Sequence, residues 1–216
     1  MFPERLVAGY RSFLGERFPR ERSRFAALAT AGQRPEVMVI GCCDSRVPPE
    51  VIFDASPGEL FVVRNVANLV PPFAPDGDYH GTSAALEFAV QALKVKHIVV
   101  LGHARCGGIK AFADGAAPLS TGDFIGKWMT MIAPVAERLG PRGDDGEDFL
   151  ARLEQAAIGQ SLKNLLTFPY VAEQVDAGQL TLHGAYFGVA TGVLLVRDPR
   201  DGSFAPAAQS PQRDSL

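Results

Sequence analysis

The sequence has neither a long apolar run nor a surplus of charge of one sign. Lys and Arg together number 21 and Asp and Glu 24, which gives a net charge of -3. So small a charge does not favour nucleic acid or an anionic membrane as partner. Apolar runs such as HIVVLG at 97–102 are far shorter than the roughly 20 residues that span a bilayer. The first 22 residues lack the apolar stretch of a secretory signal, so we expect a cytoplasmic protein.

Cysteine is also scarce. The 216 residues contain three cysteines, an odd number, in a chain long enough to build a core without disulfide bonds. In a reducing compartment such cysteines serve as metal ligands, nucleophiles or core residues. The sequence therefore does not favour a disulfide-stabilised fold.

Apolar segments alternate with amphipathic ones along the chain. Short buried strands are predicted at 36–42, 60–65 and 97–102, and two strands joined by a turn at 179–196. Helices are predicted at 3–30 (divided in two by Pro19), 82–93, 106–113, 123–139 and 147–167. This order predicts one α/β domain over 1–216, with a central, mostly parallel sheet flanked by helices and an antiparallel C-terminal edge. Residues 1–32 are expected to form a helical arm and 198–216 a flexible tail.

Soft metal-ligand residues follow two of the predicted strands. The sequence GCCDSR ends the strand at 36–42, and GHARCGG ends the strand at 97–102. Because sites in open parallel sheets form at the carboxyl ends of strands, these residues are expected to converge. Two thiolates, one imidazole and one carboxylate suit tetrahedral Zn²⁺. The predicted zinc-site residues are Cys42, Asp44, His103 and Cys106.

The alternation of side chains along a strand distinguishes the two adjacent cysteines. Cys42 and Asp44 are predicted to point to one side and Cys43 to the other. Cys42 is therefore the expected ligand, and Cys43 is expected to pack in the core as a small apolar residue. A redox switch between Cys42 and Cys43 is disfavoured, since neighbouring cysteines form only strained disulfides.

Longer motifs carry a resemblance to a known family. The segments CCDSRVPPE, PGELFVVRNVANLVPP, GTSAALEFAV and HIVVLGHARCGGIKAF resemble the β-class carbonic anhydrases, most closely the plant-type subclass. The resemblance covers most of the chain and is strongest from 33 to 128. It implies a lyase (carbonate dehydratase) that reversibly hydrates CO₂ to bicarbonate and a proton through a zinc-activated water. It further implies one Zn²⁺ per chain, held by Cys42, His103 and Cys106, and a homodimer or homotetramer.

The resemblance also assigns a regulatory and catalytic pair, Asp44 and Arg46. In the family's open state the arginine pairs with the aspartate. In its closed state the aspartate becomes the fourth zinc ligand. A bidentate arginine–carboxylate fork would hold Asp44 ionised and away from the metal. Val39 and Phe187 stand where the subtype closed by bicarbonate carries Trp and Tyr, so that inhibited state is not expected here.

The expected substrate pocket rests on the same resemblance. Phe61, Val66 and Phe88 match the family's apolar pocket, although plant-type enzymes carry Tyr at the position of Phe88. Gln33 matches a glutamine that orients substrate and is expected to come from the partner subunit. Gly107 follows Cys106 at a predicted helix start, where it offers a free N–H and close backbone approach.

Two other readings use the same residues. One is a CS₂ or COS hydrolase on the same scaffold, which shares the ligands and differs in substrate access. The other is a non-catalytic zinc module closed by Asp44 as fourth ligand. Arg46 argues against the second, because a structural site needs no guanidinium beside its carboxylate.

Overall fold

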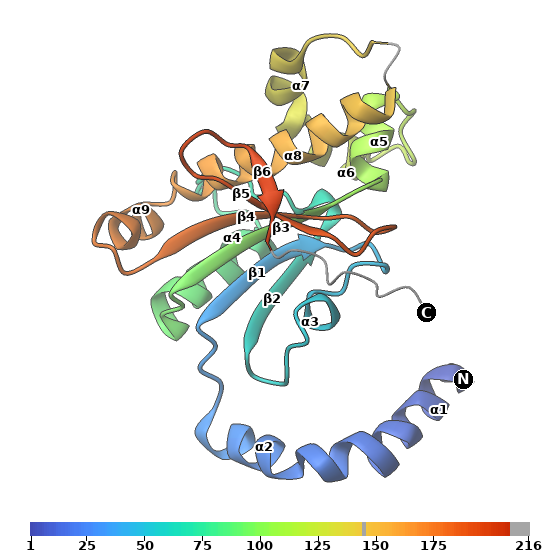
Figure 1. Cartoon of the computed structure of the whole chain (residues 1–216), viewed down its shortest axis with the longest axis vertical. Coiled ribbons are helices and arrows are strands. Elements are labelled where there is room, and N and C mark those ends of the chain that lie inside the picture. The colour runs from blue at the N-terminus through green and yellow to red at the C-terminus, as the bar shows by residue number, and fades with distance from the viewer. Residues whose placement is uncertain (144–145, 208–216) are drawn as a thin grey trace, which may run out of the picture.

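The computed structural model describes residues 1–143 and 146–207 and is built around one twisted sheet (Figure 1). The strand order is β2-β1-β3-β4-β5-β6. Strands β2, β1, β3 and β4 are parallel, and β5 and β6 add an antiparallel edge. This confirms the predicted sheet. The strand bounds are β1 (Val37–Cys42), β2 (Leu60–Asn65), β3 (His97–His103), β4 (Thr181–Phe187), β5 (Leu194–Arg197) and β6 (Phe204–Pro206).

One face of the sheet carries the main core. Met38 and Ile40 of β1 and Ile98 and Val100 of β3 are fully buried there. They pack with apolar residues from the helices that cover this face. Near-continuous apolar runs are typical of parallel strands with a covered face. The helices are α4 (Gly81–Glu87), continued by a π-helix (Phe88–Leu93), α8 (Gly146–Leu165) and α9 (Pro169–Asp176), the last of which the sequence did not predict.

The opposite face is covered more sparsely. Val39, Leu101 and Ala185 are buried there, but the apolar residues around them are only partly buried. The short helix α3 (Pro49–Ile52) lies beside this face. The remaining helices follow the carboxyl end of β3: α5 (Gly107–Ala113), α6 (Phe124–Met129) and α7 (Ala133–Leu139).

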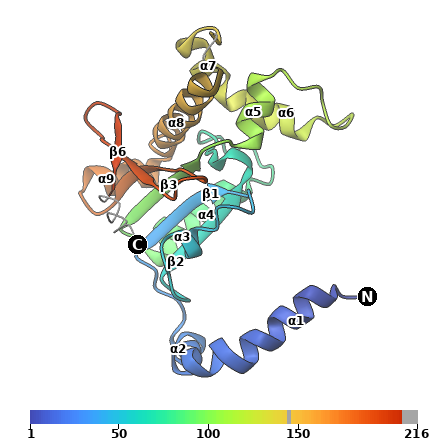
Figure 2. The same ribbon diagram turned by 45° about the vertical axis from the view of Figure 1, so that its right-hand side comes forward.

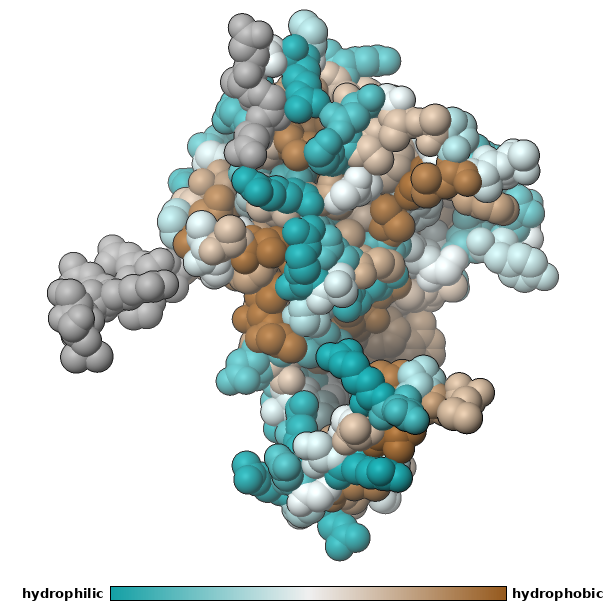
Figure 3. Space-filling model, turned by 90° about the vertical axis from the view of Figure 1, so that its right-hand side faces the viewer, coloured by the Kyte–Doolittle hydropathy of each residue, from teal (hydrophilic) through white to brown (hydrophobic). Residues whose placement is uncertain are grey.

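The N-terminal arm is one continuous curved helix, not two helices divided at Pro19. Helix α1 (Glu4–Ser12) leads through a π-helical turn (Phe13–Arg17) into α2 (Phe18–Ala31). Pro19 occupies the first turn of α2, and the wide turn before it accommodates the missing N–H. The arm stands away from the body (Figures 1 and 2), and Figure 3 shows a hollow between the two.

The segment after β5 also differs from expectation. Strand β6 lies within 198–216, which was expected to be a flexible tail, and pairs Phe204 with Arg197. A turn precedes it, with Gly202 at a φ of 80°. The few apolar residues here gave no strand pattern, and the open edge of β5 supplied the pairing. Residues 208–216 of the expected tail lie outside the described residues.

Candidate metal centre

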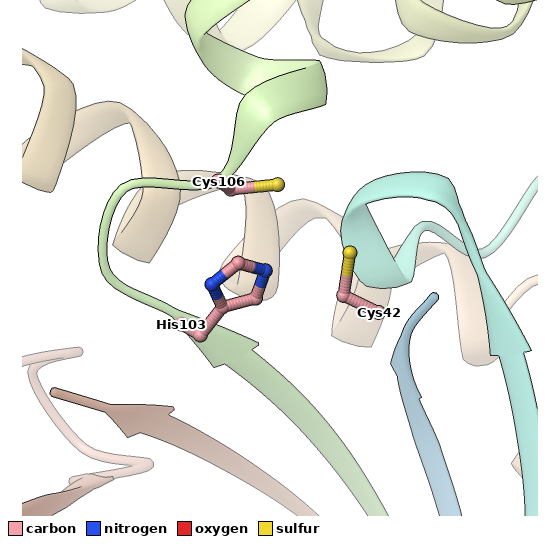
Figure 4. Close-up of side chains that lie close together, drawn as sticks. All are labelled: Cys42, His103 and Cys106. Carbon is pink, nitrogen blue, oxygen red and sulfur yellow. The ribbon is translucent and has the colours of Figure 1, made fainter. Parts of the chain in front are cut away.

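Three buried side chains converge at the carboxyl edge of the sheet. Cys42 ends β1, His103 ends β3, and Cys106 directly precedes α5. One ligand atom from each residue lies within 4.8 Å of the other two. Figure 4 shows both sulfur atoms and the imidazole facing a common space. Strands β1 and β3 pair side by side and end at this edge, which brings together two motifs distant in the chain, as the sequence predicted.

The imidazole of His103 is oriented as a metal ligand. Its Nδ1 lies 3.0 Å from the carbonyl oxygen of Ala104, which accepts the ring proton. Its Nε2 is buried and has no hydrogen-bond partner among the described residues. A buried nitrogen without a partner is costly, and a metal ion removes that cost. The free lone pair of Nε2 faces the two thiols.

The two thiols differ in acidity because they interact. The neighbouring Cys106 thiol lowers the pKa of Cys42, and His103 and the N–H of Ala67, 3.3 Å from the Cys42 sulfur, lower it further. The same interaction between the two thiols, together with burial, raises the pKa of Cys106. One thiolate therefore opposes the formation of the second unless a cation lies between them. This donor set fits Zn²⁺.

Asp44 and Arg46 form a two-pronged ion pair beside the ligands. Arg46 donates from Nε to Oδ1 of Asp44 at 2.9 Å and from Nη2 to Oδ2 at 2.6 Å. These bonds hold the pKa of Asp44 well below its usual range. Oδ2 lies 3.9 Å from Nε2 of His103, so the carboxylate borders the metal position while the arginine holds it. The family resemblance assigns this pairing of arginine and aspartate to the open state.

Arg64 fixes the backbone that carries Cys42 and Asp44. Its Nε donates to the carbonyl oxygen of Cys42 and its Nη2 to that of Asp44, both at 2.7 Å. Cys43, between them, is exposed, so the prediction that it packs in the core was wrong. Strand β1 ends at Cys42, so Cys43 lies beyond the strand, at the molecular surface.

Two of the predicted substrate residues border the centre. Gly107 is the first residue of α5, and Val66 is followed by Ala67, the hydrogen-bond partner of Cys42. Trp128 donates from Nε1 to the carbonyl oxygen of Val66 at 2.8 Å. A cavity of about 520 Å³ opens beside Val66. It is lined by Asn65, Val66, Pro71, Tyr79, His80, Gly81, Thr82, Phe124, Ile125 and Trp128.

The other predicted substrate residues do not reach the centre of their own chain. Gln33 is exposed in the link before β1, at the strand's opposite end. Phe61 lies in register with Met38, near the start of β1. Its ring is 5.9 Å from that of Phe88, which is 49% exposed. These three side chains lie apart from the ligands.

Sequence reasoning missed Glu154. This α8 residue is only 2% exposed, and its Oε1 accepts the N–H of Cys106 at 2.8 Å. Its Oε2 accepts the O–H of Tyr186 at 2.7 Å. Burial raises the pKa of Glu154, while the hydrogen bonds from Tyr186 and Cys106 lower it. The available signal was a single acid on the buried face of α8, beside Leu153, Ala157 and Ile158.

Comparisons with known proteins agree with this site. A family profile described as carbonic anhydrase matches residues 37–194. Beta carbonic anhydrase 3 of Arabidopsis thaliana is 37% identical over 197 residues, which cover 88% of this chain and 75% of that protein.

Solved structures are similar as well. The β-carbonic anhydrase CcaA superposes with a TM-score of 0.87 at 31% identity, over 96% of this chain and 92% of that one. One of two tetrameric β-carbonic anhydrases from Sordaria macrospora superposes with a TM-score of 0.76 at 30% identity, over 94% and 98%. A Coccomyxa β-carbonic anhydrase in complex with acetazolamide gives a TM-score of 0.74 at 31% identity, over 88% and 83%.

Proposed function

The chain belongs to the β-carbonic anhydrases, zinc enzymes that interconvert CO₂ and bicarbonate, and we propose how its own residues carry out this reaction. The observation that carries the proposal is the buried cluster of Cys42, His103 and Cys106 beside an ionised, restrained carboxylate. When bound by these three ligands, zinc lowers the pKa of water enough to supply a nucleophile near neutral pH.

Asp44 orients the nucleophile, and Arg46 fixes the position and ionised state of Asp44. The carboxylate borders the metal position, where it accepts a hydrogen bond and aims the nucleophile's lone pair at the carbon of CO₂. The fork from Arg46 keeps Asp44 ionised and prevents it from taking the fourth ligand position. An arrangement with Asp44 held off the metal supports an enzyme and disfavours a purely structural zinc module.

Substrate approaches along the backbone of Val66 and Gly107. CO₂ is small and apolar, which suits the apolar cavity beside Val66. The N–H of Gly107, at the start of α5, faces no intrahelical acceptor and is available to a substrate oxygen.

The catalytic site is completed by a second copy of the chain. Gln33, Phe61 and Phe88 lie away from their own ligands, and Phe88 is half exposed, so they contribute to the partner's pocket. None of residues 4–31 is buried, although the arm carries many apolar side chains. Covering them with a second subunit removes this exposed surface. Exposed apolar residues of the arm are Phe2, Leu6, Tyr10 and Leu14. We therefore propose a homodimer, which can assemble further into a tetramer.

The proposed location is the cytoplasm. It rests on the composition and on the reduced state that the ligand thiols require. Separately, among the residues that the structure describes, no helix has the length and apolarity needed to cross a membrane.

Stopped-flow CO₂ hydration tests the proposal on protein whose zinc content has been counted. Two thiolates place more negative charge on zinc than histidines do, so we expect a zinc-dependent rate that rises from neutral to mildly alkaline pH. A flat rate across that range contradicts the pH argument. No hydration by fully loaded protein contradicts the function, and a panel with CS₂ and COS then tests the alternative hydrolase.

A further inference from the structure

A cavity rich in positive charge is lined by residues of α7, α8 and the hairpin of β5 and β6. Figure 1 shows where these elements lie in the fold. Its volume is about 370 Å³. None of its lining residues belongs to the metal centre or to the proposed substrate pocket. Among the described residues, the charged side chains that line it are Arg138, Arg152, Lys163, Arg197 and one acid, Asp201.

Helix α8 forms the floor of this basic cavity. Arg152, Ala156, Gly159 and Lys163 recur at spacings of three or four residues and so share one face of the helix. The small residues Ala156 and Gly159 leave the middle of the floor open. The two long cationic side chains stand at its ends.

Arg197 enters the cavity from β5 along a path that glycines keep open. A Cβ on Gly184 would lie 3.1 Å from the Cβ of Arg197 and 3.2 Å from its Cδ. A Cβ on Gly202 would lie only 2.7 Å from Nη2 of the arginine. Among the described residues, the half-buried Arg197 makes one long side-chain hydrogen bond, 3.5 Å from Nη1 to the carbonyl oxygen of Asp198. Most of its donors therefore remain to be satisfied.

The positive charge of the basic cavity is incompletely neutralised. Arg152 pairs with Asp148 at 3.0 Å. Arg138 donates to the neutral side chain of Gln160 at 3.2 Å. Within residues 1–143 and 146–207, no ion pair involves Arg138, Lys163 or Arg197. Three such cations facing one carboxylate, Asp201, match a doubly charged anion.

We propose that this cavity binds a phosphate group, either inorganic phosphate or the phosphate of a small metabolite. Guanidinium groups bind phosphate oxygens through paired, charge-assisted hydrogen bonds, and Lys163 adds a point charge. A phosphate group carries a charge of about -1.5 to -2 at neutral pH, which complements the excess positive charge of the cavity. The proposal is independent of catalysis at the metal centre.

Isothermal titration of the zinc-loaded full-length protein with inorganic phosphate at constant ionic strength tests the site. We expect one phosphate bound per chain, displaced by sulfate and not by chloride. Arg197→Gln and Lys163→Gln should each weaken binding by about tenfold or more. Lys94→Gln, the same charge change at an exposed position outside the cavity, should leave it unchanged. Lys163 is exposed, so its variant reports on binding even if Arg197→Gln fails to fold.

Two outcomes overturn the proposal. One is the absence of saturable binding to the wild type. The other is equal affinity in the wild type and in Lys163→Gln and folded Arg197→Gln, which places the anion elsewhere, including at the zinc. Titration with glycerol phosphate distinguishes the sources: tighter binding than inorganic phosphate indicates a metabolite, and weaker binding the free ion. CO₂ hydration measured on the same samples shows separately whether the metal centre works.

Discussion

The carboxylate of Glu154 accepts a hydrogen bond from the backbone N–H of Cys106 at 2.8 Å, although the two residues are 48 positions apart in the chain. This contact joins α8 to the start of α5, where a zinc ligand must be placed. Tyr186 of β4 donates its O–H to the other carboxylate oxygen of Glu154. Helix α8 and strand β4 thus fix the position of Cys106 at the start of α5. Such outer partners of metal ligands commonly affect metal affinity.

Replacing Glu154 should therefore weaken zinc binding. Glu154→Ala leaves two buried donors without acceptors, which costs about 1–3 kcal/mol each, and frees the backbone of Cys106. We expect zinc affinity to fall about 10- to 100-fold, measured by competition with a chromogenic chelator. Glu137→Ala, on the exposed surface of α7, is the control and should bind zinc like the wild type. Unchanged affinity in Glu154→Ala would show that the contact only supports the fold.

Removing the guanidinium of Arg46 should close the metal centre. In Arg46→Ala the carboxylate of Asp44 is free to move onto zinc, so we expect CO₂ hydration to fall about 100-fold or more, as for loss of a positioning group. X-ray absorption should detect a carboxylate as the fourth ligand. The chain contains a matched control, because Arg200 forms the same fork with Asp198, two residues before it. Arg200→Ala should keep full activity. Full activity in Arg46→Ala would refute the gatekeeping role.

Asp44 should stay ionised throughout the working pH range of the enzyme. Hydrogen bonds from Arg46 lower its pKa in the folded protein below the ordinary value of 3.8. The ion pair with Arg46 therefore stabilises the folded protein at pH values above the pKa of Asp44 in the unfolded chain. This contribution is lost as pH falls through the lower pKa of Asp44 in the folded protein. Carboxyl ¹³C NMR should place the Asp44 titration below 3.8. It should move upward in Arg46→Ala protein prepared without metal. A wild-type titration at or above the ordinary value contradicts this prediction.

Adjacent glycines at the start of α5 should respond differently to alanine. A Cβ on Gly108 would lie 2.7 Å from Cγ1 of Val66, whereas a Cβ on Gly107 meets nothing within 4 Å. We expect Gly108→Ala to destabilise the protein by about 1–3 kcal/mol through overpacking. Gly107→Ala should be neutral or slightly stabilising, because alanine favours helix by up to about 1 kcal/mol. Urea unfolding of the two variants measures the difference. Equal stabilities would mean that Val66 moves freely.

The shared active site predicts complementation between two inactive chains. Gln33→Ala removes the residue that one chain supplies to its partner, and Cys106→Ser damages the chain's own centre. In the mixed dimer, the Gln33→Ala chain keeps an intact metal centre and receives Gln33 from the Cys106→Ser chain. One of the two sites is then complete, so each mixed dimer should show about half the activity of a wild-type dimer. Each variant refolded alone is the control. If Gln33 acted within its own chain, mixing would restore nothing.

Much of the fold follows from local pattern. The apolar runs at 37–42, 60–65 and 97–103 formed parallel strands because short, continuous apolar segments suit a covered sheet. The convergence of the metal ligands could be predicted because the carboxyl ends of parallel strands meet at one edge of the sheet. The prediction that Pro19 divides the N-terminal helix was wrong. A π-helical turn before Pro19 keeps the helix continuous, and local sequence rules do not predict such a turn.

The sequence by itself determined strands β1 to β5, the ligand set and the choice of Cys42 over Cys43 as a ligand, since each depends on residues close together in the chain. Tertiary structure alone decided that Cys43 meets the surface, that Glu154 reaches Cys106, and that β6 pairs with β5. It also decided that Phe61 and Phe88 lie away from their own metal centre, whereas Gln33 was already expected to serve the partner subunit. These outcomes depend on contacts between distant segments, and local periodicity carries no information about which segments meet.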